Sequence, residues 1–284
     1  MSSAGAIGVI IPPSITFVVY GSIADTSIGT LFIAGIVPGL LVGLALIATA
    51  LWIGRKEDIE IIPKSTNLMR WNALKDAFWG LLMPGIILGG IYGGVFTPTE
   101  AAAVSVIYGL FVGFFIYRTL KVKDLYGILV DSASMTAVIM FITAAASLFA
   151  YILTRSRLDI AISHGLIDLS GGNVIVFLLI VNFILLIAGC FLDSTSALFI
   201  FTPLFIPVAV ALDINLVHFG VVMIVNLAIG LITPPVGANL FVGCGVGRID
   251  LKTMSVAVLP FVLSCLVVLL LVTYIPAISL FLVK

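Results

Sequence analysis

Long apolar runs without a charged residue alternate with short polar links along the chain. A helix needs about 20 apolar residues to cross a bilayer core. The charge-free runs close to or above this length are 31–53, 77–99, 101–117, 132–154, 169–192, 194–212, 214–247 and 253–283. The links 55–76, 118–131 and 155–168 are polar. The pattern predicts an all-α integral membrane protein, with the long first link as an amphipathic segment on the membrane surface.

The run 214–247 is too long for one straight crossing, because a continuous helix over it would measure about 50 Å. Pro234 and Pro235 interrupt it, since proline lacks an N–H donor and clashes with the preceding helical turn. Gly237 permits dihedral angles that other residues avoid. We therefore expect a broken helix, and carbonyl groups near residues 231–233 that lose their helical donors.

Freed carbonyl groups in hydrocarbon must find another partner. A desolvated Na⁺ suits them, because hard cations prefer oxygen ligands and a helix C-terminus carries partial negative charge. Thr233 adds a hydroxyl and Asn239 an amide. The alternative is a simple kink whose freed groups bond to neighbouring residues.

The segment GCFLDSTS at 189–196 places Asp193 between two apolar arms. It is either a loop between two full crossings or the tip of a re-entrant hairpin. An acid inside the membrane is a candidate functional residue, but Asp193 could equally cap the helix that starts at Ser194. The N–H groups and hydroxyls of Ser194, Thr195 and Ser196 suit an anionic substrate group, and the hydroxyls also suit a cation.

An internal repeat links the two ends of the chain. At an offset of 222 residues, seven residues of segment 7–38 recur in segment 229–260, namely Ile7, Gly8, Ile10, Pro12, Pro13, Gly21 and Pro38. Their second copies are Ile229, Gly230, Ile232, Pro234, Pro235, Gly243 and Pro260. No gap is needed, so the match indicates two related structural units.

Basic residues orient these units, because Lys and Arg concentrate in cytoplasmic loops. Placing the link 55–76 in the cytoplasm leaves only Arg155, Arg157 and Lys284 of the 13 basic residues outside. The copy at 229 then runs inwards and the copy at 7 outwards. Inverted repeats with broken helices near the membrane midplane are typical of secondary transporters.

The repeat also predicts the organisation of the chain. Residues 1–53 form the end of the first inverted repeat, 54–131 hold the amphipathic segment and a helical pair, and 132–284 form the second repeat. The first copy has only six residues before it, so we expect about 90 or more residues of an equal repeat to be absent upstream. The chain is therefore expected to be N-terminally truncated.

Composition supports a lipid environment and narrows the function. The chain is 62% hydrophobic and 9% charged, with net charge zero and a mean hydropathy of +1.34. These values argue for a bilayer as solvent and against a nucleic-acid partner. The three cysteines match no metal or disulfide spacing. Neither histidine lies in an H-E-x-x-H motif and no G-x-S-x-G elbow stands out, so we expect no enzyme.

At these motifs the sequence resembles the large membrane subunit of tripartite ATP-independent periplasmic (TRAP) transporters, the DctM-like proteins. The resemblance covers essentially the whole chain. Its most specific segments are IPPSITFVVYGSIADTSIG at 11–29, FTPTEAAAVSVIYG at 96–109, GCFLDSTSALFIFTPLFIPVAVAL at 189–212 and HFGVVMIVNLAIGLITPPVGANLFV at 218–242.

The resemblance implies an elevator-type, Na⁺-coupled importer of the ion-transporter superfamily in the bacterial inner membrane. It implies a re-entrant hairpin at 173–211 and a broken helix at 217–247. It also implies a periplasmic substrate-binding protein that delivers an organic carboxylate, such as a C4-dicarboxylate or sialic acid, and a small four-helix membrane subunit. Na⁺ is the coupling ion, and no other cofactor is expected.

The resemblance and the repeat together give a set of candidate site residues. The expected sodium ligands are Gly189, Gly230, Thr233 and Val236, with Gly8, Ile11 and Ser14 around the first break. The expected substrate contacts are Asp193, Ser194, Thr195, Ser196, Pro234 and Asn239. The alternative function is a membrane scaffold or channel-like subunit that does not transport.

Overall fold

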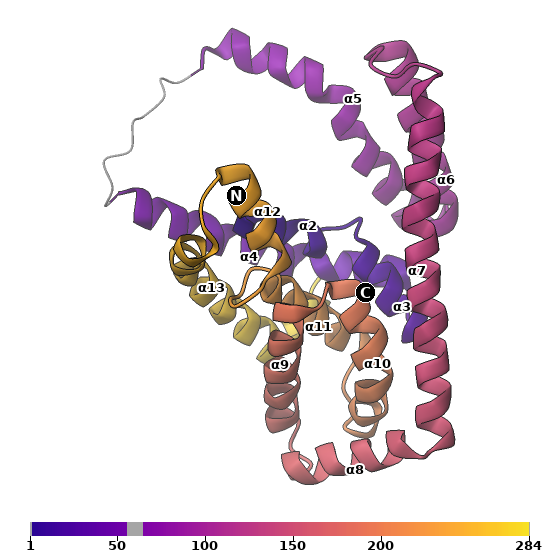
Figure 1. Cartoon of the computed structure of the whole chain (residues 1–284), viewed down its shortest axis with the longest axis vertical. Coiled ribbons are helices and arrows are strands. Elements are labelled where there is room, and N and C mark those ends of the chain that lie inside the picture. Colours follow the sequence, from indigo (N-terminus) through magenta and orange to yellow (C-terminus); the bar gives the residue numbers. More distant parts are fainter. Residues whose placement is uncertain (1, 56–64, 284) are drawn as a thin grey trace. The chain divides into compact units, whose positions relative to one another are not determined.

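The computed structural model describes residues 2–55 and 65–283, and these residues form helices and no strand. They divide into two compact units, Met1–Glu57 with Ile142–Lys284, and Asp58–Phe141. The repeat and every candidate site residue lie in the first unit. Figure 1 labels the helices along the chain.

The first unit begins with four helices and continues, after the second unit, with the end of α7 (Asp124–Arg155) and seven more helices. The first four are α1 (Ser2–Gly5), α2 (Ile7–Ile10), α3 (Ile15–Ile23) and α4 (Ile28–Gly54). The others are α8 (Leu158–Ser170), α9 (Val174–Phe191), α10 (Ser194–Ala211), α11 (Leu216–Gly230), α12 (Ala238–Gly247), α13 (Leu251–Tyr274) and α14 (Pro276–Leu280). Polar N-cap side chains start several of them, including Asn173, Asp193, Asn215 and Asp250.

Helix α11 is the centre of this unit. Every residue from His218 to Gly230 is buried. The helix packs against α2, α3, α4, α9, α10, α13 and α14. An apolar helix that is buried on all sides belongs in the core of a membrane bundle, so α11 is the scaffold against which the site is built.

The two breaks occupy equivalent positions in the two repeats. Helices α2 and α3 flank residues 11–14, and the segment Ser2–Ile10 is bent by 44° against Ile15–Ile23. Helices α11 and α12 flank residues 231–237. Both breaks contain a cis peptide bond, Pro12–Pro13 and Pro234–Pro235. The prediction that the Pro-Pro pair interrupts the helix is confirmed. A short helix follows each break, α3 or α12, and a long helix comes next, α4 or α13. The two long helices pack against each other.

The second unit contains a pair of packed helices and the start of a longer one. These are α5 (Asn67–Tyr92), α6 (Pro98–Phe111) with a π-helical turn (Val112–Ile116), and the first part of α7 (Asp124–Arg155). The Tyr108 hydroxyl donates to the Trp79 carbonyl at 2.7 Å, which ties α6 to α5. Thr97 and Glu100 form a reciprocal capping box at the start of α6.

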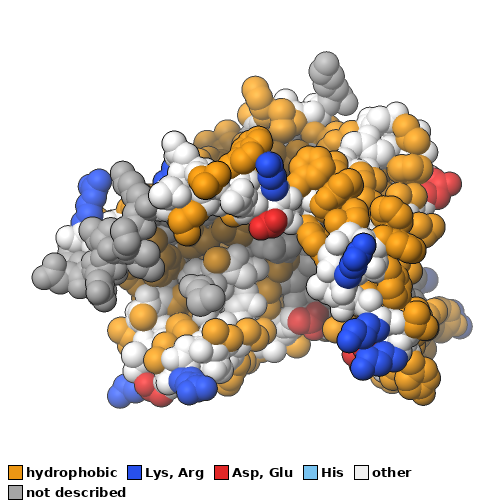
Figure 2. Space-filling view, turned by 90° about the horizontal axis from the view of Figure 1, so that it is seen from above, with side chains coloured by type: hydrophobic (Ala, Val, Ile, Leu, Met, Phe, Trp, Pro, Cys, Tyr) orange, Lys and Arg blue, Asp and Glu red, His pale blue; other side chains and the backbone are white. Residues whose placement is uncertain are grey.

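Within residues 2–55 and 65–283, seven helices are long and apolar enough to cross a membrane, or eight if the bent pair around the first break counts as one span. Figure 2 shows hydrophobic side chains over much of the visible surface, with charged ones single or in small groups. The predicted all-α membrane protein is confirmed.

Several predicted links contain helix, which corrects the sequence reading. Helix α8 fills most of the link 155–168, and α7 begins inside the link 118–131. Polar residues interrupt an apolar run without ending a helix, because charged residues such as Lys, Arg and Glu have high helix propensity. The amphipathic segment expected at 55–76 lies partly outside the described residues, and its last ten residues are the start of α5.

Candidate functional site

Two glycines bring α9 and α11 into backbone contact. A Cβ built on Gly230 would lie 2.6 Å from the Gly189 Cα and 3.1 Å from the Gly189 carbonyl oxygen. A Cβ built on Gly189 would lie 3.0 Å from the Gly230 Cα. Only glycine fits at such an approach, so both predicted sodium ligands are fixed where the two helices touch.

The end of α11 rearranges its hydrogen bonds at the break. The N–H of Thr233 donates to the Gly230 carbonyl at 2.9 Å rather than to residue 229, and its hydroxyl donates to the Ile229 carbonyl at 2.7 Å. The Leu231 carbonyl accepts from the N–H of Asn239 at 3.0 Å, across the break. The carbonyl groups of Ile229, Gly230 and Leu231 have therefore lost their normal helical donors, as the sequence predicts for the break, and accept from Thr233 and Asn239 instead, as the simple-kink alternative expects.

Gly237 closes the break and ties it to the α9–α10 turn. Its φ is +56°, a left-handed value, and its N–H donates to the Cys190 carbonyl at 2.9 Å. A Cβ on Gly237 would lie 2.9 Å from the Leu231 carbonyl oxygen and 3.0 Å from that of Thr233. Backbone oxygens thus converge on this glycine at the negative end of the α11 dipole.

The α9–α10 turn presents a helix N-terminus next to that break. Asp193 is the N-cap of α10, is exposed, and accepts from the Ser196 N–H at 3.0 Å, so the capping alternative describes its geometry. The Ser194 hydroxyl is buried and has no partner among the described residues. Thr195 and Ser196 are half-buried in the first turn of α10.

Asn239 brings a second polar group without a partner. It lies in the first turn of α12, and its Nδ2 atom has no hydrogen-bond partner among the described residues. That atom is 3.0 Å from the position of a Cβ on Gly5, in α1. Pro234 and Val236 lie half-buried inside the break itself.

The first break forms a separate group. The Ser14 hydroxyl donates to the Val9 carbonyl at 2.6 Å, and the Thr16 hydroxyl donates to the same oxygen at 3.0 Å. The two hydroxyls are 2.8 Å apart and both side chains are buried. Gly8 and Ile11 are exposed. Thr16 was not among the expected residues, although it lies two residues from Ser14 and its hydroxyl reaches the same carbonyl.

The donor set at the second break suits a hard monovalent cation. It consists of neutral oxygens from the α9 turn, the α11 end and the break, without a carboxylate or a thiolate. Such oxygens match Na⁺ better than soft metals, and the structure places no group of three His, Cys, Asp or Glu side chains together in its described part.

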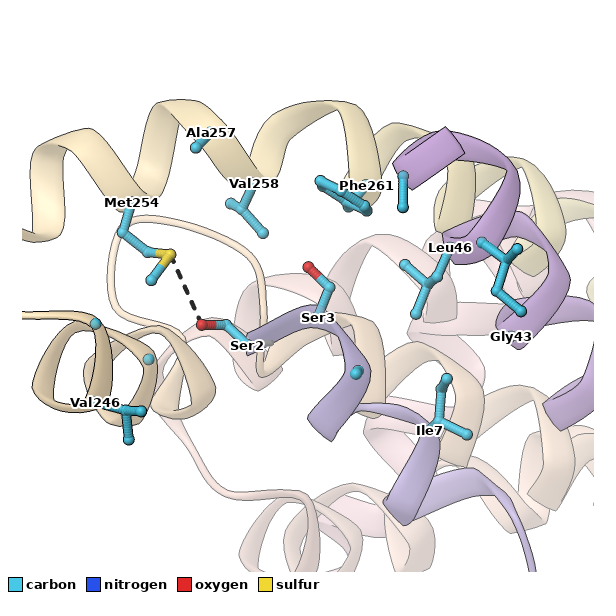
Figure 3. Close-up of a pocket in the computed structure, with 15 residues that line it drawn as sticks. Ser2, Ser3, Ile7, Gly43, Leu46, Val246, Met254, Ala257, Val258 and Phe261 are labelled. Carbon is cyan, nitrogen blue, oxygen red and sulfur yellow. Dashed lines mark hydrogen bonds between the residues drawn. The ribbon is translucent and has the colours of Figure 1, made fainter. Parts of the chain in front are cut away.

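A cavity lies elsewhere in the first unit. It has a volume of about 490 Å³ and is lined by α1, α2, α4, α12 and α13. Figure 3 shows Ser2 and Ser3 on one side of it, with the Ser2 hydroxyl 3.7 Å from the Met254 sulfur, and apolar side chains on the other side. No predicted site residue lines it. An apolar lining does not suit a carboxylate.

A buried polar network that the sequence did not predict lies beside the site. The side chains of Asn182, Asn226 and Thr273 are joined by hydrogen bonds. His218 is 2% exposed and bonds to Ser279 and the Thr273 carbonyl. The only sign of this network in the sequence is that Asn182 and Asn226 each stand alone in an apolar run.

Comparison with known proteins now decides the family. The family model described as "Tripartite ATP-independent periplasmic transporter, DctM component" matches residues 1–278. The chain belongs to the DctM family. The match confirms the resemblance that the sequence motifs indicate. Together with the membrane-spanning helices, it makes the chain a multi-pass protein of the bacterial inner membrane.

Curated relatives carry several substrate names. The chain is 46% identical over 279 residues to the C4-dicarboxylate TRAP transporter large permease protein DctM of Pseudomonas aeruginosa. It is 44% identical over 282 residues to the isethionate TRAP transporter permease protein DctMQ of Oleidesulfovibrio alaskensis. It is 41% identical over 276 residues to the sialic acid TRAP transporter large permease protein SiaM of Vibrio cholerae.

These matches cover nearly all of this chain and only part of each relative. The covered share of the chain is 98%, 99% and 97%, and the covered share of the relative is 65%, 44% and 64%, in the same order. The chain thus spans about two thirds or less of these relatives' lengths. All three are permeases of TRAP transporters by name.

Proposed function

We propose that this chain is part of a Na⁺-coupled permease that imports an organic anion delivered by a periplasmic binding protein. The observation that carries the proposal is the joining of the α9–α10 turn to the broken helix. Gly189 packs on Gly230, and the Cys190 carbonyl accepts from the Gly237 N–H. A cation bound at these oxygens would therefore act directly on the turn.

The sodium proposal assigns each group a role. The carbonyl oxygens at Gly189, Gly230 and Val236 and the Thr233 side chain coordinate the ion. The Thr233 hydroxyl donates its proton to the Ile229 carbonyl, so the lone pairs of the hydroxyl oxygen stay available to a cation. Gly8, Ile11 and Ser14 form the equivalent group at the first break. No other cofactor is proposed.

The substrate proposal uses the start of α10. The N–H groups there favour an anion through the helix dipole, and the unpartnered Ser194 hydroxyl can donate to it. Thr195, Ser196, Pro234 and Asn239 complete the contacts, and Asp193 holds the turn as its N-cap. The relatives' names include dicarboxylate, sialic acid and isethionate, so the shared feature is an acidic organic substrate rather than one acid.

The transport step is proposed to be an elevator movement. The α9–α10 turn lies against a break inside the 214–247 run, which supports a re-entrant hairpin rather than two full crossings. The loaded repeat would carry ion and substrate across together, with a small four-helix membrane subunit bracing the rest. The chain acts as a carrier and not as an enzyme.

Uptake measurements test the proposal. Proteoliposomes receive a permease assembly that contains this chain, with its small subunit and binding protein, and labelled dicarboxylate or sialic acid is offered outside. An inward Na⁺ gradient should drive accumulation that a K⁺ gradient does not. Equal uptake under both gradients would refute sodium coupling, and no uptake by a correctly assembled complex would favour the scaffold function.

A further inference from the structure

Helices α9 and α11 touch along their whole shared length. Three contacts join them in the same order along both helices: Phe177 with Phe219, Asn182 with Asn226, and Gly189 with Gly230. Because residue numbers rise together, the helices run parallel. The middle contact is the polar one, and no predicted role uses it.

The middle contact is a side-chain amide pair inside an apolar bundle. The Asn226 Nδ2 donates to the Asn182 Oδ1 at 2.8 Å and to the Asn182 backbone carbonyl at 2.9 Å. The Asn182 Nδ2 in turn donates to the Thr273 hydroxyl at 3.0 Å. Asn226 is fully buried and Asn182 is 6% exposed. One pair therefore connects α9, α11 and α13.

Packing alone would favour apolar side chains in place of this amide pair. The Asn226 amide must face Asn182 with its NH₂ group, because the opposite orientation would set an oxygen against two acceptors. Its Oδ1 is then buried without a partner among the described residues. A buried unsatisfied oxygen lowers stability, so an apolar side chain would serve stability better, and a buried polar pair of this kind is best attested as a device that fixes register.

The register of the two helices matters because the glycine contact lies one turn further along α11 and two turns further along α9. Gly230 follows Asn226 by four residues, about 6 Å along α11, and Gly189 follows Asn182 by seven residues, about 10 Å along α9. A slip of one residue would turn α11 by about 100° and set the side chain of Ile229 or Leu231 against Gly189. The glycine contact admits no such side chain.

We infer that Asn182 and Asn226 are positioning residues for the sodium site. They set the register of α11 on α9 so that the carbonyl oxygens at the α9 turn and at the break point to one ion. The inference rests on the proposed sodium coupling. Neither asparagine touches the ion; each acts through the helix that carries a ligand.

The test compares sodium affinity with maximal rate. Asn226→Leu and Asn182→Leu replace the amides with apolar side chains of similar size, and Thr273→Val removes only the outer acceptor. The matched control is Tyr20→Phe, which removes a buried hydrogen bond to the Leu216 carbonyl at the other end of α11 (2.7 Å). Each variant is assembled into the same proteoliposomes, and uptake is measured against Na⁺ concentration.

The Asn variants should raise the Na⁺ concentration for half-maximal uptake by about threefold to tenfold while most of the maximal rate remains. Tyr20→Phe should lower the melting temperature without moving that concentration. An unchanged half-maximal concentration in both Asn variants, or an equal shift in Tyr20→Phe, would overturn the inference. If Asn226→Leu does not fold, Thr273→Val decides, with a smaller shift expected. Sodium-independent uptake by the unmodified protein would instead overturn the proposed function.

Discussion

Gly189 and Gly230 approach each other so closely that neither position has room for a side chain. A methyl group on Gly230 would come within 2.6 Å of the Gly189 Cα and 2.7 Å of its carbonyl carbon. At this point, α9 and the buried helix α11 meet through backbone atoms alone. This close approach brings carbonyl groups of two helices, rather than side chains, to the same point.

Gly230→Ala should disrupt the contact and with it the sodium response. The added methyl meets backbone atoms that cannot move without shifting a helix, and overpacking of this kind costs about 1–3 kcal/mol of folding free energy. The measurement is the melting temperature of the purified protein in NaCl and in choline chloride. Gly245→Ala is the control, because a Cβ there meets nothing within 4 Å. A Gly230→Ala protein with normal stability and a normal sodium response would contradict the packing argument.

Gly237→Ala should lose more folding stability than the cost of a left-handed backbone conformation alone. A non-glycine residue in that region costs about 1–2 kcal/mol, and at Gly237 the methyl also approaches two carbonyl oxygens. Gly171→Ala is the control, since Gly171 has φ +59° in open space. Chemical denaturation of both variants should show the larger loss at Gly237. Equal losses would mean that the carbonyl groups at the break move aside freely.

Thr233→Val should weaken sodium dependence more than it weakens folding. The change keeps the shape and removes a hydroxyl that caps the Ile229 carbonyl, a bond with a net worth of about 1 kcal/mol. Thr49→Val removes the same kind of bond, from Thr49 to the Ala45 carbonyl at 2.9 Å, inside the unbroken part of α4. Both variants should lose similar stability, but only Thr233→Val should raise the Na⁺ requirement for uptake. Parallel behaviour of the two would favour a simple kink at the break.

Ser194→Ala should leave the substrate-free protein as stable as before. The hydroxyl it removes is buried without a partner, so its loss costs no hydrogen bond. Substrate affinity should fall by about tenfold, the cost of one hydrogen bond to a charged group. Thr202→Val removes another buried hydroxyl without a partner, in the same helix, and should leave uptake kinetics unchanged. Unaltered substrate affinity in Ser194→Ala would remove this hydroxyl from the substrate site.

The sequence predicted the helices and their breaks because both follow from local chemistry. Apolar runs longer than a bilayer core must be helical, and Pro234 and Pro235 cannot continue a helix. The repeat placed the first break in the same way. Gly189 and Gly230 were expected near one another only through the family resemblance, since no local rule brings residues 41 positions apart into contact.

Other features depend on packing that the sequence does not display. The polar residues of the link 155–168 do not end helical structure, so the hydrophobic pattern does not predict α8. His218 is buried with Ser279, because α14 folds back over the start of α11, and nothing in its local sequence indicates this. The Asn182–Asn226 pair needs two helices in register, and each asparagine alone gives no sign of its partner.

Sodium binding at the break is tested most directly by equilibrium binding of radioactive ²²Na⁺ to the purified assembly that contains this chain, without substrate or gradient. We expect saturable binding that unlabelled Na⁺ displaces and K⁺ does not. Gly230→Ala should weaken this binding strongly, while Gly245→Ala should leave it unchanged. Binding that is absent, or that persists unaltered in Gly230→Ala, would show that the break between α11 and α12 is not the sodium site.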